Sequence, residues 1–501
     1  MNYVKALLFL LLAFSFTAAQ AQTAKPSEHK AAPAPAKQST GVATSWRQVP
    51  IPALHQFKPQ EPRRVQLPNG MVIFLQEDHE LPLIDGTIRI RGGSREEPAG
   101  KVGMIALYAD VWRTGGTKSK TGDELDDFLE AHAARVEASD SADSTFLSWS
   151  SLKENYDQVF PVVIDLLENP EFRQDKIDLA KQQFASLISR RNDDIDEIAQ
   201  RESTKLAYGA ENPYARTAEY ATIDAITRED LLQWHKRTVA PGNMILGLAG
   251  DFDSAAMEQT LRQAFGTLPA GEPFVPAKIV FNPPRPGIYF VEKNDVNQSD
   301  IQMVELGIDR RNPDYYAVEV MNELFGGGFS SRLFVSIRTR QGLAYSVGGG
   351  VGTAFDHSGI TRFSMGTKSG TTAAGIDALR KEFDGLIQGT VKAGELKKAK
   401  DSILNSFIFE FDSKEKVLSE RMRYEFYGFP PDFLERFRAG IEKVTAADVD
   451  RVARKYLHPE KMAVLVVGNA KDFDRDLSTF GKVTTIDISI PEKKAEKSGS
   501  N

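Results

Sequence analysis

The residue types and spacing that most suggest chemistry in this chain are an arginine and a tyrosine, Arg338 and Tyr345, within the stretch 324–346 (LFGGGFSSRLFVSIRTRQGLAYS). A guanidinium and a phenol held side by side can donate hydrogen bonds to a peptide carbonyl, or to an oxyanion that develops on it. Spacing alone leaves an alternative open, in which the stretch is a helix-loop-strand connection with a surface arginine and a half-buried tyrosine.

The residues before the pair predict a flexible corner and a short helix. Gly326, Gly327 and Gly328 suit a backbone that needs positive φ or close approach to a partner, such as a loop that adapts to a substrate; a plain tight turn is the alternative. Ser330 or Ser331 can cap the helix that follows. The expected apolar face of that helix is Leu333, Phe334 and Ile337.

The end of the stretch predicts how the two side chains are presented. Gly342 is an expected left-handed cap that ends the helix, and Leu343–Val347 is an expected strand. Arg338 then leaves from the last helical turn and Tyr345 from the strand. Both side chains can therefore face one groove.

The motif SSRLF, followed by Arg-x-x-x-Gly-Leu-Ala-Tyr, resembles the substrate-binding motif of insulinase-type (pitrilysin-like) zinc peptidases. In those proteins the motif lies in the C-terminal half. The resemblance implies that Arg338 and Tyr345 hold the substrate backbone and assist the transition state beside a zinc ion bound elsewhere. It also implies that the fold consists of two α+β rolls that enclose a peptide-binding space.

Members of that family carry H-x-x-E-H on the first helix after the opening strands, where two histidines bind zinc and the glutamate activates water. The matching helix here is 103–113, and the motif positions are Ala106, Ala109 and Asp110. Alanine has no ligand atom, and one aspartate cannot hold zinc with useful affinity. The family's further glutamate falls in a stretch that contains Ala185 and Ser186. We therefore predict no metal site in this chain.

Other catalytic chemistry has little support in the sequence. There is no cysteine, no G-x-S-x-G motif and no phosphate-binding G-x-x-x-x-G-K-[ST]. No two histidines are four positions apart, so we expect no second zinc site. The seven histidines are His29, His55, His79, His132, His235, His357 and His458.

An internal repeat sets the domain organisation. The segment ITREDLLQWHKRTVAPGNMILGLAGDFD begins at Ile226, and VTAADVDRVARKYLHPEKMAVLVVGNAKDFD begins at Val444. In each copy a threonine, Thr227 or Thr445, caps a helix, and an apolar strand follows. The chain therefore contains two similar halves, and strands grouped apart from helices argue for an α+β fold.

The expected boundaries follow from composition and from this repeat. They are a signal peptide at 1–21, a disordered leader at 22–60, an N-terminal peptidase-like domain at 61–269, a Pro-rich linker at 270–285, a C-terminal peptidase-like domain at 286–490 and a disordered tail at 491–501. The first domain should open with a hairpin around Pro68-Asn69-Gly70 and a strand at Leu83–Arg91. It should continue with a strand at Ser144–Leu152 and with helices at Glu154–Glu168 and from Gln174 past Asp194.

The composition of the chain indicates where the protein is located and which classes of partner it is expected to bind. The signal sequence and the absence of cysteine fit export to the periplasm of a Gram-negative bacterium. A retained N-terminal anchor is the alternative to cleavage. The formal net charge of −7 argues against nucleic acid as a partner. No stretch of the mature chain is long and apolar enough to cross a membrane.

The hypothesis from sequence is a subunit that binds no cofactor itself and works with a homologous partner that carries H-x-x-E-H and zinc. Together the two chains would hydrolyse unfolded peptides, with Arg338 and Tyr345 contributed by this chain. Two alternatives stay open. One is a catalytically inert scaffold or peptide-binding pseudo-peptidase, and the other is a self-sufficient peptidase with displaced metal ligands.

Overall fold

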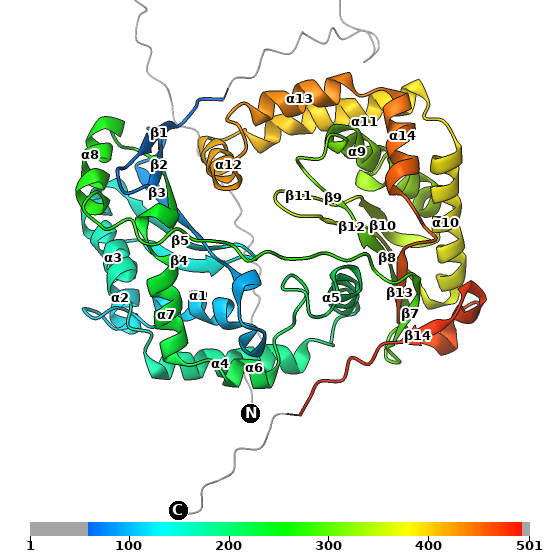
Figure 1. Cartoon of the computed structure of the whole chain (residues 1–501), viewed down its shortest axis with the longest axis horizontal. Coiled ribbons are helices and arrows are strands. Elements are labelled where there is room, and N and C mark those ends of the chain that lie inside the picture. The colour runs from blue at the N-terminus through cyan, green and yellow to red at the C-terminus, as the bar shows by residue number, and fades with distance from the viewer. Residues whose placement is uncertain (1–58, 493–501) are drawn as a thin grey trace, which may run out of the picture. The chain divides into compact units, whose positions relative to one another are not determined.

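Two six-stranded sheets, one from each half of the chain, organise residues 59–492, which are the residues described by this computed structural model (Figure 1). Helices flank each sheet, and this confirms the predicted α+β fold of two similar halves. The predicted signal peptide lies outside the described residues, as do the leader and the tail except for residues 59, 60, 491 and 492. None of the helices within 59–492 combines the length and the apolar run that a membrane span requires.

The first sheet has the strand order β1-β2-β6-β3-β5-β4. Its strands are β1 (Arg63–Gln66), β2 (Val72–Glu77), β3 (Leu83–Arg91), β4 (Arg135–Asp140), β5 (Ser144–Leu152) and β6 (Met244–Gly250). The helices of this half are α1 (Met104–Thr114), α2 (Gly122–Ala131), α3 (Tyr156–Glu168), α4 (Gln174–Arg190), α5 (Ile195–Tyr208), α6 (Tyr220–Asp224), α7 (Arg228–Thr238) and α8 (Ser254–Phe265). The predicted opening hairpin and the strands β3 and β5 are confirmed.

The second sheet has the order β14-β7-β13-β8-β12-β10. Its strands are β7 (Gly287–Glu292), β8 (Gln298–Leu306), β10 (Ala344–Gly350), β12 (Ile360–Lys368), β13 (Ala463–Gly468) and β14 (Val483–Thr485); β9 (Ile308–Asp309) and β11 (Thr353–Ala354) form a separate pair. The helices are α9 (Tyr315–Asn322), the π-helical segments η6 (Glu323–Gly327) and η7 (Phe334–Arg340), α10 (Thr372–Gln388), α11 (Ala393–Ser406), α12 (Lys414–Tyr427), α13 (Phe433–Lys443) and α14 (Ala446–Tyr456).

The internal repeat is visible in both the capping chemistry and the topology. Thr227 begins α7 with a capping box to Asp230, and Thr445 begins α14 with the same capping box to Asp448. The strands that follow, β6 and β13, take the third place in their sheets. The predicted repeat is therefore confirmed at the level of helix start, strand and sheet position.

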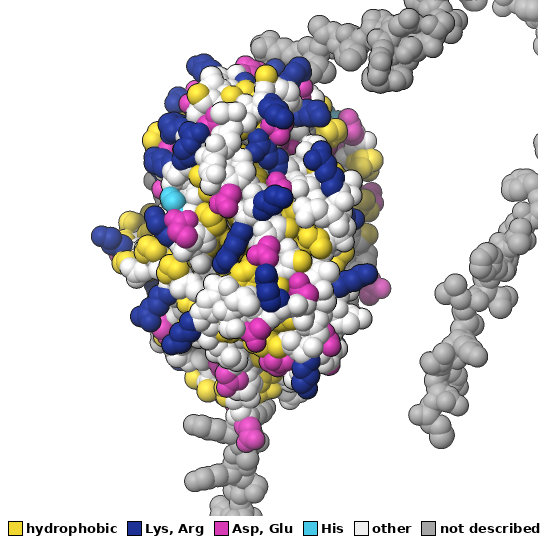
Figure 2. Space-filling model, turned by 90° about the vertical axis from the view of Figure 1, so that its right-hand side faces the viewer, with side chains coloured by type: hydrophobic (Ala, Val, Ile, Leu, Met, Phe, Trp, Pro, Cys, Tyr) yellow, Lys and Arg dark blue, Asp and Glu magenta, His cyan; other side chains and the backbone are white. Residues whose placement is uncertain are grey.

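Each sheet packs a helical layer on one face. In the first half, Ile84, Ile88 and Ile90 of β3 join the core beneath α1 and α3, as their alternation predicts. In the second half, Ile301 and Met303 of β8 belong to the corresponding core. The outer side of the second half, where α10 and α14 lie, shows charged side chains of both signs interspersed (Figure 2). That mixture is typical of a solvated helical layer.

The other face of each sheet, here called its inner face, is covered by a helix from the opposite half. Helix α12 packs on β2 and β6 of the first sheet, and α5 packs on β8 and β13 of the second (Figure 1). Apolar residues fill both contacts; they are Val72, Phe74, Ile245, Ala249, Leu418, Met422 and Phe426 on the first sheet, and Ile198, Ala199, Val291, Leu465 and Val467 on the second. The two halves therefore hold each other through reciprocal helices.

Two features differ from, or refine, the sequence predictions. The helix expected from Gln174 past Asp194 ends at Arg190, because the Asp194 side chain accepts the backbone N–H groups of Asp196 and Glu197 and starts α5. The linker 270–285 contains no helix or strand. It is fixed to the first half, where the Phe274 backbone N–H donates to the Asn243 side chain at 2.9 Å.

Candidate functional site

Helix α1 presents the three positions that match the zinc motif. Together they do not supply the ligands that zinc requires. Ala109 is buried and Ala106 is half-buried. Asp110 is exposed as a whole residue, but neighbouring atoms partly desolvate its carboxyl group and so raise its pKa. On the neighbouring α4, the Ser186 hydroxyl donates to the backbone carbonyl of Gln182. Within residues 59–492, no group of three or more His, Asp or Glu side chains lies close enough to hold a metal ion. The residues present therefore do not fit zinc.

The face of α1 that carries Tyr108 is buried in the core of the first half. The Tyr108 hydroxyl lies 2.8 Å from Nδ1 of His235, and Nε2 of His235 lies 2.8 Å from the Leu167 carbonyl oxygen. His235 therefore donates a hydrogen bond through Nε2–H to the carbonyl, and its Nδ1 accepts a hydrogen bond from the Tyr108 hydroxyl. Burial lowers the pKa of His235 to about 4. This neutral histidine anchors the helix and leaves no free nitrogen for a metal.

Two further histidines have partners that explain them without a metal. His79 lies between the carboxylates of Glu77 and Asp251, at 2.9 and 2.5 Å. His357 stacks on Tyr214 with a centroid distance of 4.2 Å, in the segment between β11 and β12. Both histidines have structural contacts, although neither contact was foreseen from sequence.

The elements around the Arg/Tyr motif follow the prediction in order, and of the expected apolar face Leu333 and Ile337 are buried in the core whereas Phe334 is only half-buried. The Ser331 hydroxyl accepts the backbone N–H of Phe334 at 3.4 Å and so caps the helical turn, which is π-helical. Gly342 has φ of +65°, as expected for a left-handed cap. Strand β10 then begins at Ala344 and continues to Gly350, beyond the predicted end at Val347.

Tyr345 lies at a β-bulge that turns it toward the inner face of the second sheet. Ala344 pairs with Thr367 on β12 and Ser346 pairs with Gly366, so Tyr345 is the extra residue. Its ring lies directly across Gly366, where a Cβ atom would overlap ring atom Cζ. The side chain is 47% exposed. Partial burial, together with nearby acidic groups, raises the pKa of the Tyr345 hydroxyl, which therefore stays protonated and able to donate.

Arg338 lies on the adjacent element η7 and is exposed to solvent. Its guanidinium carbon is 4.7 Å from the centre of the Phe334 ring, and Phe334 packs edge-on against the exposed Phe329. The structure places Arg338 and Tyr345 on neighbouring elements and records no contact between their side chains. That both contact one substrate stays a prediction.

The glycine corner differs from the expectation of positive φ. Gly326 and Gly327 belong to the π-helical turn η6, and Gly328 is extended with φ of −159°. The requirement for glycine is instead steric, because a Cβ on Gly326 would meet the backbone of Gly349 on β10. The corner thus packs closely against the strand that carries Tyr345.

Comparison with known proteins identifies the family. Residues 73–218 match the family described as Insulinase (Peptidase family M16), and residues 225–403 match the Peptidase M16 inactive domain. The chain belongs to the insulinase-like peptidase family M16. This agrees with the resemblance carried by the Arg/Tyr motif.

Relatives of this M16 chain include proteins named as proteases and one named as a non-peptidase. The non-peptidase homolog YmxG of Helicobacter pylori is 24% identical over 405 residues, which cover 80% of this chain and 92% of that protein. An uncharacterized zinc protease of Rickettsia felis is 24% identical over 404 residues, covering 78% and 93%. The names of these relatives therefore differ in whether they describe a peptidase.

Two solved structures share the fold. The peptidase M16 inactive domain from Pseudomonas fluorescens superposes with a TM-score of 0.73 at 24% identity, covering 81% of this chain and 98% of that one. A protease from Helicobacter pylori gives 0.72 at 19% identity, covering 82% and 100%. The two-sheet architecture described above is therefore the M16 fold.

A cavity of about 760 Å³ is lined by Ser346, the residue after Tyr345 on β10, and by residues that sequence reasoning missed. It lies between α5, residues 214–218 and the inner faces of β8, β10 and β12. Asp196, Asp300, Gln302 and Ser346 line it. A signal for two of them was present, because polar Asp300 and Gln302 alternate with apolar neighbours along β8.

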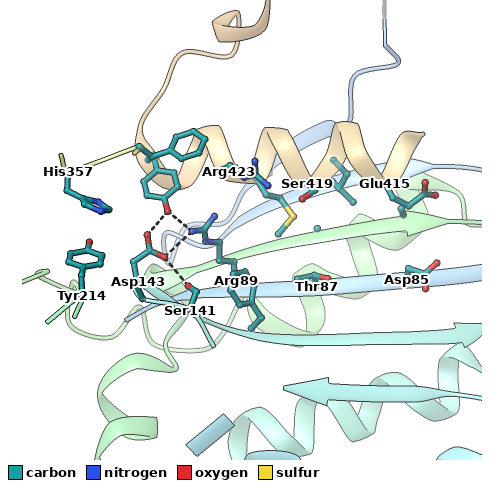
Figure 3. A pocket seen from close by; sticks show the side chains of 18 residues that line it. Asp85, Thr87, Arg89, Ser141, Asp143, Tyr214, His357, Glu415, Ser419 and Arg423 are labelled. Atoms are coloured by element: carbon teal, nitrogen blue, oxygen red, sulfur yellow. Dashed lines mark hydrogen bonds and ion pairs between the residues drawn. The ribbon is translucent and has the colours of Figure 1, made fainter. Parts of the chain in front are cut away.

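A second cavity, of about 550 Å³, lies between α12 and the inner face of the first sheet (Figure 3). At one end the Tyr427 hydroxyl donates to Asp143 at 2.5 Å, and the Arg89 guanidinium donates to Asp143 and to Tyr427, both at 3.2 Å. Neither Arg338 nor Tyr345 is a lining residue of this cavity or of the one beside Ser346. The network joins the two halves and is separate from the predicted site.

Proposed function

We propose that this chain is the non-zinc-binding subunit of a two-chain, periplasmic M16 peptidase. A homologous partner with H-x-x-E-H would supply zinc and the activated water. This chain would bind the substrate's main chain through Arg338 and Tyr345, and close the other side of the peptide-binding space. Its own reaction chemistry would be limited to hydrogen-bond donation.

One observation carries the proposal. The helix at the zinc-motif position presents Ala106, Ala109 and Asp110, while Tyr345 is half-exposed on the inner face of the second sheet, next to the cavity that Ser346 lines. A bulge that turns a phenol toward such a space is typical of a functional position.

The geometry suits stabilisation of developing charge. The Tyr345 hydroxyl stays protonated because its pKa is raised, so it can donate to a carbonyl oxygen as negative charge grows there. Arg338 is permanently charged and, being exposed, is free to reorient toward the same oxygen. Removing one such donor typically lowers the rate by about 10²- to 10³-fold.

Co-expression with a zinc-motif homologue tests the proposal. We expect peptide hydrolysis only when both chains are present, and a fall in kcat/KM of about 10²- to 10³-fold in Arg338→Ala and in Tyr345→Phe. Arg340→Ala is the matched control, because Arg340 is another exposed arginine two positions away. Its activity should equal that of the unmodified chain.

Two results would contradict this assignment. Stoichiometric zinc in the purified chain would favour a self-sufficient peptidase with displaced ligands. Full activity in both Arg338→Ala and Tyr345→Phe would favour an inert scaffold, a second candidate that is supported by the lack of contact between the two side chains. The periplasmic location is tested separately, by fractionation and by sequencing the mature N-terminus, which we expect after Ala21.

A further inference from the structure

The cavity that Ser346 lines contains carboxylates that no ion pair within residues 59–492 neutralises; Arg362, which faces Asp300 from β12, donates to the Thr204 hydroxyl at 2.8 Å. Asp196, Glu197 and Asp300 all line the cavity, and none forms an ion pair with a described residue. The two arginines in the lining are bonded elsewhere. Arg201 donates to the Glu202 carboxylate at 2.7 Å, and Arg216 donates to the backbone carbonyl of Glu97 at 2.9 Å.

The floor of the cavity has unused hydrogen-bonding capacity. Gln302 is 5% exposed, and its Nε2 donates to Asp300 Oδ1 at 2.6 Å. Its carbonyl oxygen Oε1 has no hydrogen-bond partner among the described residues. A buried acceptor of this kind costs free energy unless a donor reaches it. A carboxylate and an amide oxygen together favour a ligand that is cationic and rich in N–H donors.

The position of these acceptors relative to Tyr345 follows from sheet register. Gly366 pairs directly with Asp300 on β8, and the Tyr345 ring lies across Gly366. The phenol and the buried carboxyl thus occupy one row of the inner face. A group bound at the phenol would carry an adjacent side chain or terminus toward Asp300.

We infer that this cavity binds a positively charged group of a peptide, a Lys or Arg side chain or a free α-amino group, between Asp196 at its rim and Asp300 and Gln302 at its floor. The inference rests on the proposed function, because a peptide held by its main chain at Tyr345 is the ligand that brings the charge. Selectivity for peptides with a cationic group follows.

The charged surroundings of Asp300 predict how binding depends on pH. Asp196 faces it from α5, Gln302 from β8, Arg362 from β12 and Tyr345 from β10. Burial, with the neighbouring Asp196, raises the pKa of Asp300 to about 7. A cationic group must displace this proton, so its binding should weaken as the pH falls below 7, by up to about tenfold per unit.

Fluorescence anisotropy with labelled peptides and the whole chain tests the inference. The first probe is an acetylated, amidated peptide with one central arginine, and the second has citrulline, a neutral analogue of similar shape, at that position. We expect the arginine peptide to bind at least about fivefold more tightly. If an unacetylated citrulline peptide binds as tightly as the arginine peptide, the α-amino group is the charge that the cavity binds.

Variants separate this site from the rest of the molecule. Asp300→Asn keeps the hydrogen bond to Gln302 but removes the carboxylate, and it should reduce the arginine preference to less than about twofold. Asp196→Asn, on the exposed surface of α5, should have the same effect. Asp251→Asn, in the separate cluster around His79, is the control and should change nothing. Circular dichroism checks that each variant folds.

Equal or undetectable binding of all peptides would overturn the inference, as would an arginine preference that survives in both Asp300→Asn and Asp196→Asn. Failure of the proposed function has a different signature. In that case the arginine preference would persist, while Arg338→Ala and Tyr345→Phe would leave the hydrolysis by the two-chain mixture unchanged.

Discussion

At the scale of residues, the placement of Tyr345 depends on neighbours with no functional groups of their own. The bulge at Tyr345 turns its ring inward, and Gly366 provides the flat backbone on which the ring lies. The three heavy atoms closest to a Cβ at Gly366 all belong to the Tyr345 side chain. Gly366 is therefore a positioning residue for the phenol.

Gly366→Ala tests this relation. The new methyl group should displace the phenol, and activity with the zinc-motif partner should fall about as far as in Tyr345→Phe. Stability should also fall, by about 1 to 3 kcal/mol, because the site is overpacked. Urea unfolding and peptide hydrolysis measure the two effects.

The double variant Gly366→Ala/Tyr345→Ala provides the control. If the methyl group acts only on the tyrosine ring, adding Gly366→Ala to Tyr345→Ala should cost almost no further stability. A full additional loss in the double variant would mean that Gly366 is needed for another reason.

At the scale of elements, each sheet depends on a helix that the sequence places in the opposite half. α12 follows α5 by 219 positions, close to the 218-residue spacing of the repeat, so the two helices are equivalent in the repeat. In α12, Phe426 packs on the first sheet, and the Arg89 guanidinium lies 3.6 Å from the centre of its ring. Burial of such side chains is the main favourable contribution of this contact.

Phe426→Ala should therefore destabilise the protein by about 3 to 5 kcal/mol, the usual cost of removing a buried phenylalanine. Phe409→Ala is the matched control, since Phe409 is 62% exposed, and should stay within about 0.5 kcal/mol. Urea denaturation of both variants measures the difference. A loss below about 1 kcal/mol in Phe426→Ala would show that α12 does not hold the first sheet.

At the scale of the whole molecule, polar groups reach between the halves at several places. Arg64 bonds to Glu425, and Arg95 bonds to Asp356. Asp300 of β8 faces Asp196 of α5, where two carboxyl groups meet at a contact between the halves. This last pairing makes the stability of the whole molecule dependent on pH.

The sign of that dependence follows from the raised pKa of Asp300, about 7 in the folded state against about 4 in an unfolded chain. The folded state holds this proton more tightly, so its contribution is fully present below about pH 4 and is lost as the pH rises through 7. Between pH 5 and 8, the unmodified chain should lose about 1 to 3 kcal/mol more stability than Asp300→Asn. Urea unfolding at both pH values measures this.

Comparison with the variant isolates Asp300, because the lowered pKa of buried His235 acts in the opposite direction below pH 6.5. Identical pH profiles for the two proteins would contradict the assignment of a raised pKa to Asp300.

The sequence by itself determined the local structure and the missing zinc ligands. Helix caps, β3, β5 and the repeat depend on periodicity and on side chain to backbone hydrogen bonds within a few residues, and these are readable in order along the chain. The loss of ligands at Ala106 and Ala109 is equally direct, because alanine has no donor atom in any fold.

Only the tertiary structure decided which distant residues share a space. Asp196 and Asp300 belong to different halves, and they meet because α5 crosses to the sheet of the other half. The steric need for Gly366 likewise exists only once β10 and β12 pair with a bulge at Tyr345. Such contacts depend on register and on packing between remote segments, which leave no periodic signal in a single sequence.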